Sequence, residues 1–119
     1  MIIRRGQVWL IDFGVPRGSS PGYKRPAVVI QSDGFNKTNI DSIIVASVTT
    51  TSRLSRMPGN VEVAKAVGGL REDSIVNITQ LFTVDRSDLL ELWGALPKAK
   101  LKEVEAGLRL VLALPQKVE

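Results

Sequence analysis

Pro26-Ala27-Val28-Val29-Ile30 is a short, uninterrupted apolar run that is rich in β-branched residues. A run of this length between turn residues is typical of a buried strand. Proline is tolerated at the first position of a strand, where its missing N–H group does not interrupt the ladder. We therefore expect a central strand over residues 26–30, which the chain enters through Pro26.

Further strands are predicted on both sides of this run. The segments either alternate apolar and polar residues or are short apolar runs, and turn-forming residues separate them. They span residues 7–13, 42–48, 61–63, 74–81 and 92–96. Residues 17–24, which are rich in Gly, Ser and Pro, are expected to form a loop, as is the polar and basic segment 49–60.

The last third of the chain carries helical signals. Asp85 is a favourable N-cap and Asp88 suits the first turn, so a short helix is predicted over residues 86–92. Pro97 suits the start of a second helix of about 15 residues, which should end before Pro115. The apolar residues of that helix fall on one stripe, as expected for packing on a core. They are Leu101, Val104, Leu108 and Val111.

Together these elements predict one domain over residues 1–119, mainly β with α: a small curled sheet or barrel covered by the C-terminal helix. The hydrophobic share of 44% and the charged share of 24% exclude bulk disorder and fibrous repeats. Arg4 and Arg5 interrupt the apolar start of the chain, and no apolar run approaches the roughly 18 residues of a membrane span. We expect a cytoplasmic protein with no membrane partner.

The chain contains neither cysteine nor histidine. These absences exclude disulfides, a thiolate nucleophile, a Cys-based zinc site and any catalysis through an imidazole. The carboxylates show no metal-ligand spacing, and the glycines form no phosphate-binding or dinucleotide motif. We therefore expect neither a metal nor a cofactor.

The charge is unevenly distributed. The formal net charge is +4, and residues 1–60 carry eight basic against three acidic residues, whereas residues 61–119 carry eight against nine. A basic half on a small domain favours an anionic partner, of which nucleic acid is the commonest. A net charge of this size is also explained by solubility alone.

Two segments of the basic half are suited to hold a phosphate group. Lys24 and Arg25 stand at the entry to the central strand, and the planar guanidinium fork of arginine matches phosphate oxygens. The hydroxyl-rich run Thr49-Thr50-Thr51-Ser52 follows the 42–48 strand and precedes Arg53 and Arg56. Each segment also has an ordinary interpretation. Lys24 and Arg25 are then solvated surface charges, and the hydroxyl-rich run is the loop that follows a strand.

The aromatic residues are few. Tyr23 lies in the predicted loop, where it is able to stack on a base or to pack locally. Trp9 and Trp93 lie inside strand patterns, so we expect both to be core or interface residues.

The ordered set of motifs resembles the MazF/PemK family of toxin endoribonucleases. The resemblance extends from about residue 3 to residue 112 with few length changes, and the set is specific although the motif around Pro26 is weak by itself. The segments that carry it are 5–13 (RGQVWLIDF), 18–19 (GS), 24–31 (KRPAVVIQ), 44–50 (IVASVTT), 71–76 (REDSIV), Gln80 and 83–85 (TVD).

This resemblance implies an SH3-like barrel with a C-terminal helix, a homodimer, cleavage of single-stranded RNA without a metal, and a cognate antitoxin as inhibitor. By motif position, Arg25 matches the catalytic arginine of the family and Thr49 its catalytic hydroxyl residue. Ser19 and Gln80 match positions that help to hold RNA. With the loop and hydroxyl-run residues added, the predicted RNA-binding set is Ser19, Tyr23, Lys24, Ser52, Arg53, Arg56 and Gln80.

The predicted chemistry agrees with the composition. RNA carries its own nucleophile, the 2′-hydroxyl, so a protein needs only to position it, stabilise the developing charge and manage protons. The expected products are a 2′,3′-cyclic phosphate and a 5′-hydroxyl. The general base stays open, because neither arginine nor threonine readily accepts a proton at neutral pH.

Two alternative functions fit the same fold. One is a non-catalytic RNA-binding barrel, which would have no need for Arg25 and Thr49 together. The other is a same-fold toxin that poisons a topoisomerase through an aromatic-rich C-terminal helix end. Residues 114–119 contain no aromatic residue, which disfavours the second alternative.

Overall fold

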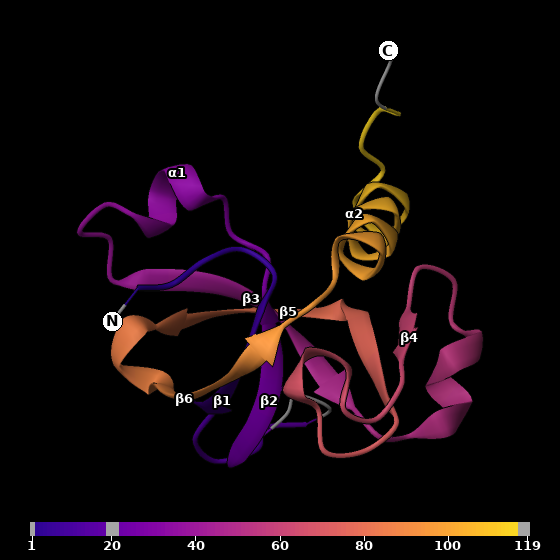
Figure 1. Cartoon of the computed structure of the whole chain (residues 1–119), viewed down its shortest axis with the longest axis horizontal. Coiled ribbons are helices and arrows are strands. Elements are labelled where there is room, and N and C mark those ends of the chain that lie inside the picture. The colour runs from indigo at the N-terminus through magenta and orange to yellow at the C-terminus, as the bar shows by residue number, and fades with distance from the viewer. Residues whose placement is uncertain (1, 19–21, 117–119) are drawn as a thin grey trace.

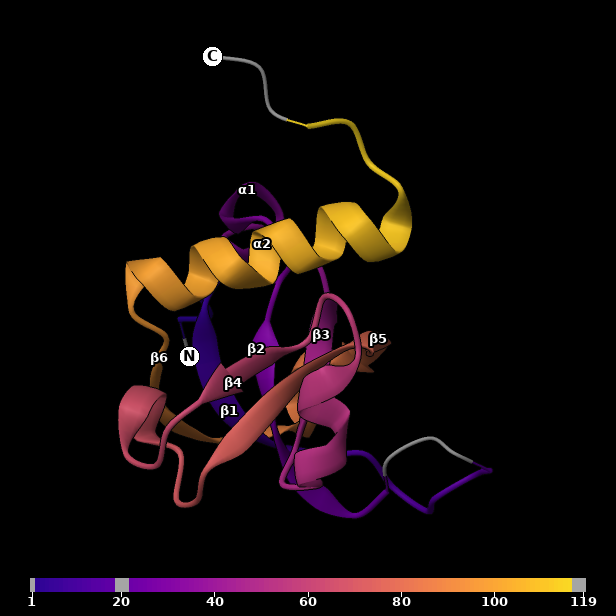
Figure 2. The ribbon, with the colours of Figure 1, turned by 90° about the vertical axis from the view of Figure 1, so that its right-hand side faces the viewer.

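Six strands form one antiparallel sheet in the computed structural model, which describes residues 2–18 and 22–116. Their order in the sheet is β4-β5-β3-β2-β1-β6. The strands are β1 (Gln7–Asp12), β2 (Lys24–Val29), β3 (Ser42–Thr49), β4 (Val61–Val63), β5 (Ser74–Asp85) and β6 (Leu89–Ala95). The sheet curls strongly, and helix α2 (Lys98–Leu112) lies across one end of it (Figures 1 and 2). This architecture confirms the predicted curled sheet with a C-terminal helix.

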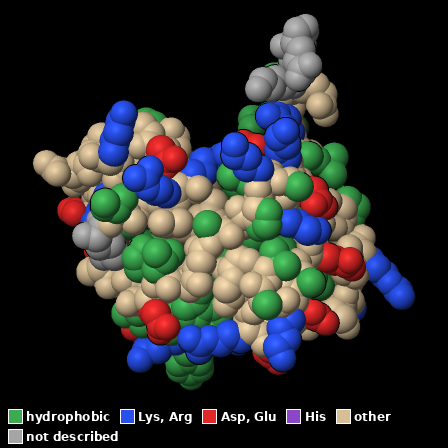
Figure 3. Space-filling model, in the orientation of Figure 1, with side chains coloured by type: hydrophobic (Ala, Val, Ile, Leu, Met, Phe, Trp, Pro, Cys, Tyr) green, Lys and Arg blue, Asp and Glu red, His purple; other side chains and the backbone are tan. Residues whose placement is uncertain are grey.

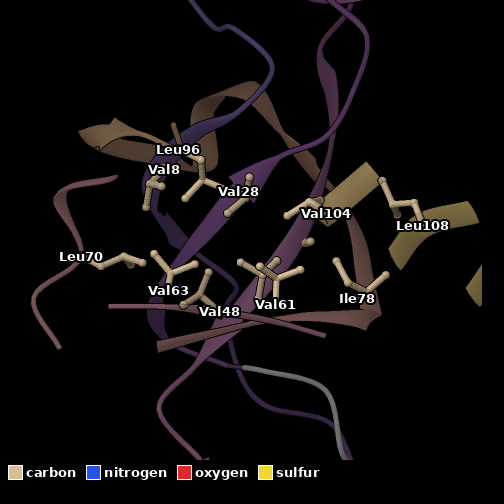
Figure 4. Close-up of a cluster of buried hydrophobic side chains, with 12 residues drawn as sticks. Val8, Val28, Val48, Val61, Val63, Leu70, Ile78, Leu96, Val104 and Leu108 are labelled. Atoms are coloured by element: carbon tan, nitrogen blue, oxygen red, sulfur yellow. The ribbon is translucent and has the colours of Figure 1, made fainter. Parts of the chain in front are cut away.

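The central strands are buried on both faces, which explains their continuous apolar sequence. Along β2, Val28 belongs to one hydrophobic cluster, whereas Ala27 and Val29 belong to the other. Successive side chains of a strand point to opposite faces of the sheet, so each strand supplies both clusters. The first cluster, shown in Figure 4, also receives Val104 and Leu108 from α2.

The pairing of β3 with β5 is interrupted near the middle of β5. Ala46 pairs with Leu81 and the next residue, Ser47, pairs with Asn77, so residues 78–80 of β5 have no partner on β3. Extra residues on one strand bend it and increase its twist. The first half of β5 therefore pairs with both β4 and the end of β3, while its second half follows the start of β3.

Helix α2 packs through the stripe that its sequence predicts. Val104 is fully buried and Leu108 nearly so, whereas Leu101 and Val111 are half-buried. Gly107 allows the helix backbone to approach the loop before β4, because a Cβ atom there would overlap the carbonyl oxygen of Gly59. The helix spans 15 residues and ends with Ala113 in the left-handed conformation.

The predicted helix over 86–92 is wrong. Residues Arg86–Asp88 form only a 3-10 turn (η3), and β6 begins at Leu89. The capping prediction itself is confirmed: Asp85 accepts from the backbone N–H of Ser87 at 2.9 Å, and Asp88 accepts from that of Asp85 at 3.1 Å. Pairing of β6 with β1 overrides the helix, since it buries Leu89 opposite Ile11.

Three short elements have no counterpart in the sequence predictions. They are α1 (Asp33–Asn36), η1 (Ser52–Arg56) and η2 (Val67–Gly69). None of the described helices is long and apolar enough to cross a membrane.

Candidate active site

Arg25 is the second residue of β2 and pairs with Ile11 near the C-terminal end of β1. Its side chain is exposed, and its Nε donates a hydrogen bond to the carbonyl oxygen of Gly22 at 3.1 Å. It forms no ion pair with any described residue. The guanidinium is therefore anchored by one nitrogen, and its terminal amino groups are available to a ligand.

Thr49 is the last residue of β3 and pairs with Ile75 of β5. Its side-chain oxygen accepts a hydrogen bond from the backbone N–H of Thr51 at 3.1 Å and lies 3.2 Å from the hydroxyl oxygen of Thr51. This local turn is the kind that threonine favours where a strand ends. It holds the hydroxyl group of Thr49 in one place.

Arg25 and Thr49 line the same pocket, which has a volume of about 210 Å³. Because β2 and β3 are antiparallel neighbours, the start of one strand lies beside the end of the other. The remaining lining residues are Pro26, Val48, Thr50, Leu70, Arg71, Glu72, Ser74 and Trp93. The two residues that the sequence analysis paired are thus brought together by the fold.

One wall of this pocket was not predicted. The side chain of Arg71 lies over the ring of Trp93, with its guanidinium carbon 4.2 Å from the ring centroid, and its Nη2 is 3.4 Å from Oε1 of Glu91. Trp93 is half-buried against the first cluster, as expected for a core aromatic, and its indole Nε1 has no hydrogen-bond partner among the described residues. The signal for this wall was the segment 71–76, which belongs to the family resemblance.

Two glycines bring that wall together. A Cβ atom on Gly69 would overlap the carbonyl oxygen of Trp93, and one on Gly94 would lie 2.5 Å from the carbonyl oxygen of Gly68. Gly69 also has a φ of +79°, which L side chains rarely adopt. The backbone of η2 therefore touches β6, and this contact sets Arg71 beside Trp93.

A family model for the PemK-like, MazF-like toxin of type II toxin–antitoxin systems matches residues 4–112. The chain belongs to this family.

Curated members of the family from mycobacteria resemble the chain over nearly its whole length. Endoribonuclease MazF2 of Mycobacterium bovis is 40% identical over 114 residues, which cover 96% of this chain and 100% of that protein. Endoribonuclease MazF6 of Mycobacterium tuberculosis shows the same identity and coverage.

Solved structures of MazF proteins share the fold. A mycobacterial endoribonuclease in complex with its cognate antitoxin aligns with a TM-score of 0.79 and 22% identity, covering 97% of this chain and 99% of that one. MazF from Deinococcus radiodurans aligns with a TM-score of 0.78 and 22% identity, covering 95% and 98%. The predicted MazF-like barrel is confirmed.

The other described residues that were predicted to bind RNA do not line the pocket of Arg25 and Thr49. Ser52 lines a neighbouring pocket of about 570 Å³, which shares Thr50 and Ser74 with the first. Arg53 and Arg56 are exposed on η1, and each is adjacent in sequence to a residue that lines that pocket, Ser52 and Ser55.

Tyr23, Lys24 and Gln80 share no pocket with Arg25 and Thr49. Tyr23 and Lys24 line an open hollow with Asp12, and Tyr23 is 66% exposed. Gln80 lies among the residues of β5 that have no partner on β3, and it does not line the pocket of Arg25 and Thr49. Ser19 lies outside the described residues.

The charges at the pocket are mainly positive. Of the charged residues in the part of the chain that the structure describes, Arg25, Arg71 and one carboxylate, that of Glu72, line it. On the face of the molecule shown in Figure 3, Lys and Arg side chains include a row along the lower edge, where the ends of β1 and β2 lie in Figure 1. No three carboxylates converge among the described residues in a way that could hold a metal ion.

The two carboxyl groups whose pKa is clearly shifted serve the fold. A hydrogen bond from the backbone N–H of Arg5, at 2.7 Å, holds the pKa of Asp33 below its ordinary value, and one from Asn36 adds to this. Hydrogen bonds from Ser87 lower the pKa of Asp85 in the same way. Neither group lines the pocket of Arg25 and Thr49.

Proposed function

We propose that this chain is an endoribonuclease that cuts single-stranded RNA without a metal, as the toxin of a type II toxin–antitoxin pair in the cytoplasm. The observation that carries the proposal is the pocket that Arg25 and Thr49 share. Its support is the 40% identity to mycobacterial proteins that are named endoribonucleases.

Arg25 suits the stabilisation of the reacting phosphate. Attack by the RNA 2′-hydroxyl on the adjacent phosphorus places extra negative charge on the non-bridging oxygens. A guanidinium with free terminal amino groups donates two parallel hydrogen bonds to such oxygens. The bond from Nε to Gly22 orients the group before substrate arrives, so little reorganisation is needed during the reaction.

Thr49 suits a supporting role at the same phosphate. Its hydroxyl group is held by the backbone N–H of Thr51 and is a neutral donor. Cleavage by this route yields a 2′,3′-cyclic phosphate and a 5′-hydroxyl.

The surroundings of the pocket supply contacts for the flanking nucleotides. Lys24, Arg53 and Arg56 provide phosphate contacts, Tyr23 provides a stacking surface, and Ser52 provides a hydroxyl donor. Single-stranded RNA is the preferred form, because its bases can be separated and its backbone can bend into a small pocket. Ser19 and Gln80 complete the proposed RNA-binding set.

The proposed protein partners are a second copy of the chain and an antitoxin. β6 is an edge strand of the sheet, and its exposed Leu90 and Leu92 offer apolar surface to a second copy. Mycobacterial and Deinococcus radiodurans relatives of the same fold are known in complex with an antitoxin. For this basic chain we propose an extended, acidic antitoxin segment with apolar anchors.

The test is incubation of the purified chain with a long single-stranded transcript in excess EDTA. Discrete fragments with cyclic phosphate ends are expected, and a duplex of the same sequence should stay intact. Binding without fragments would indicate a non-catalytic RNA-binding barrel. Intact RNA together with trapped topoisomerase–DNA complexes would indicate a topoisomerase poison. Cleavage that needs added magnesium would contradict the proposal.

A further inference from the structure

The proposed reaction needs a group that removes the proton from the 2′-hydroxyl. The chain offers no histidine and no cysteine for this purpose. Arginine holds its proton too tightly, and the threonine hydroxyl is a poor base at neutral pH. The loop over residues 14–23 contains no carboxylate in its sequence. The base must therefore come from another segment of the chain.

Glu72 provides the one carboxylate among the described residues that line the pocket of Arg25 and Thr49. Its backbone is fixed on both sides. Leu70 is buried at 2% exposure, and the hydroxyl of Ser74 donates to the carbonyl oxygen of Glu72 at 2.7 Å. The carboxylate of Asp73 accepts a hydrogen bond from the backbone N–H of Lys65 at 2.9 Å, so it is occupied in holding the turn. Glu72 is thus presented by a braced segment.

The Glu72 carboxylate is free to act. It forms neither an ion pair nor a side-chain hydrogen bond with any described residue. The adjacent Arg71 does not neutralise it, since that guanidinium lies on Trp93 and reaches Glu91 instead. The other charged side chains that line the pocket are Arg25 and Arg71, both cationic. Carboxylates are ordinarily ionised at neutral pH and accept protons in enzymes.

We propose that Glu72 is the general base of the RNA cleavage reaction, an inference that rests on the proposed function. The 2′-hydroxyl gives its proton to the Glu72 carboxylate as the 2′-oxygen bonds to phosphorus. The bond from phosphorus to the 5′-oxygen breaks, and that oxygen takes a proton from water. The products are the 2′,3′-cyclic phosphate and the 5′-hydroxyl, and the protonated Glu72 returns its proton to solvent.

The test compares Glu72→Gln with Glu103→Gln, an equal loss of charge on the exposed face of α2. Cleavage sites are first mapped on a long transcript. A short RNA with one mapped site then gives the single-turnover rate, and its 2′-deoxy analogue gives the affinity. E72Q should cleave about 10²- to 10⁴-fold more slowly, as is typical when a general base is lost. Its affinity should be unchanged or tighter, because a negative charge has been removed, and E103Q should match the wild type.

Three further readouts separate a base from an acid and from a residue that only shapes the pocket. The wild-type rate should rise with pH along an acidic limb, and E72Q should lose that limb. In a substrate with sulfur in place of the 5′-oxygen, the leaving group is a thiolate, which departs without taking up a proton. This substrate should restore the rate of a variant that has lost a general acid, but it should not restore the rate of E72Q. Glu72→Asp should retain part of the rate. Thermal unfolding checks that E72Q is folded, which we expect because the Glu72 side chain is exposed.

The outcomes distinguish this inference from the function on which it rests. Cleavage by the wild type in EDTA with equal cleavage by E72Q, or an unchanged acidic limb in E72Q, would overturn the role of Glu72 alone. Rescue of E72Q by the sulfur substrate would also overturn it, in favour of an acid. A wild-type chain that leaves RNA intact would overturn both.

Discussion

Arg25→Ala should separate catalysis from stability in a single variant. The guanidinium is exposed, and its one hydrogen bond to a described residue joins Nε to the carbonyl oxygen of Gly22 at 3.1 Å. A hydrogen bond of this kind contributes about 0.5–1.5 kcal/mol to the free energy of unfolding. For a domain of this size the melting temperature should fall by roughly 4 °C. The variant should therefore be well folded at 25 °C.

The expected loss of activity is much larger. Removing one preorganised donor to a transition-state oxygen typically costs about 10²–10³ in rate, or about 2.7–4 kcal/mol. The affinity for RNA depends on several phosphate contacts, so the loss of one should weaken binding modestly and reduce the salt dependence by about one ion. Arg25→Lys is the matched control, because it keeps the charge and removes the planar fork.

Three measurements on the same samples test this reasoning. Single-turnover cleavage reports the chemical step, binding of a 2′-deoxy analogue reports affinity, and thermal unfolding reports stability. R25A should lose rate far more than affinity, and R25K should recover affinity more than rate. Equal losses of rate and affinity in R25A would show that Arg25 only holds the substrate, and a melting temperature lowered by tens of degrees would show that it is part of the fold.

Three other predictions test the fold and the partner. Asp33 has a lowered pKa, so its stabilising effect is present above its ordinary pKa of 3.8 and is lost as the pH falls through the lowered value. Urea unfolding should show that Asp33→Asn is less stable than the wild type at pH 7 and that this difference disappears in acid. Gly107→Ala should lower the melting temperature, whereas alanine normally favours a helix, because the new Cβ would meet the carbonyl oxygen of Gly59. An acidic antitoxin peptide should compete with the 2′-deoxy RNA analogue and associate more slowly as salt rises; simultaneous binding of both at full affinity would contradict a shared surface.

Most of the sheet was predictable because its strands carry local signals. The run from Pro26 to Ile30 indicated a buried strand, and the pattern around Val104 indicated which face of α2 is buried. The prediction of a helix after Asp85 was wrong because the segment has the capping residues of a helix, whereas its conformation is determined by pairing with β1, more than 70 residues earlier in the chain. Pairing between distant strands leaves little trace in the local sequence.

The residues of the pocket also divide into those with a local sequence signal and those placed by distant contacts. Arg25 and Thr49 were found because each stands at the end of a recognisable strand and because the motif order resembles a known family. Glu72 and Trp93 were not selected for the site, since their approach depends on the strand order and on the close contact between Gly69 and β6. Two backbones come this close only where glycine leaves out the side chain. Composition and residue spacing do not show which glycines make such a contact.

The position of β1 between β2 and β6 affects when the pocket forms during synthesis of the protein. Synthesis proceeds from the N-terminus, so Arg25 and Thr49 leave the ribosome well before Trp93 of β6 exists. The pocket is closed only when β6 has been made and has paired with β1. Until then the pocket of Arg25 and Thr49 lacks the wall that Trp93 provides. Detaching β6 from β1 in the finished protein would remove the same wall and leave Arg25 and Thr49 on their own strands.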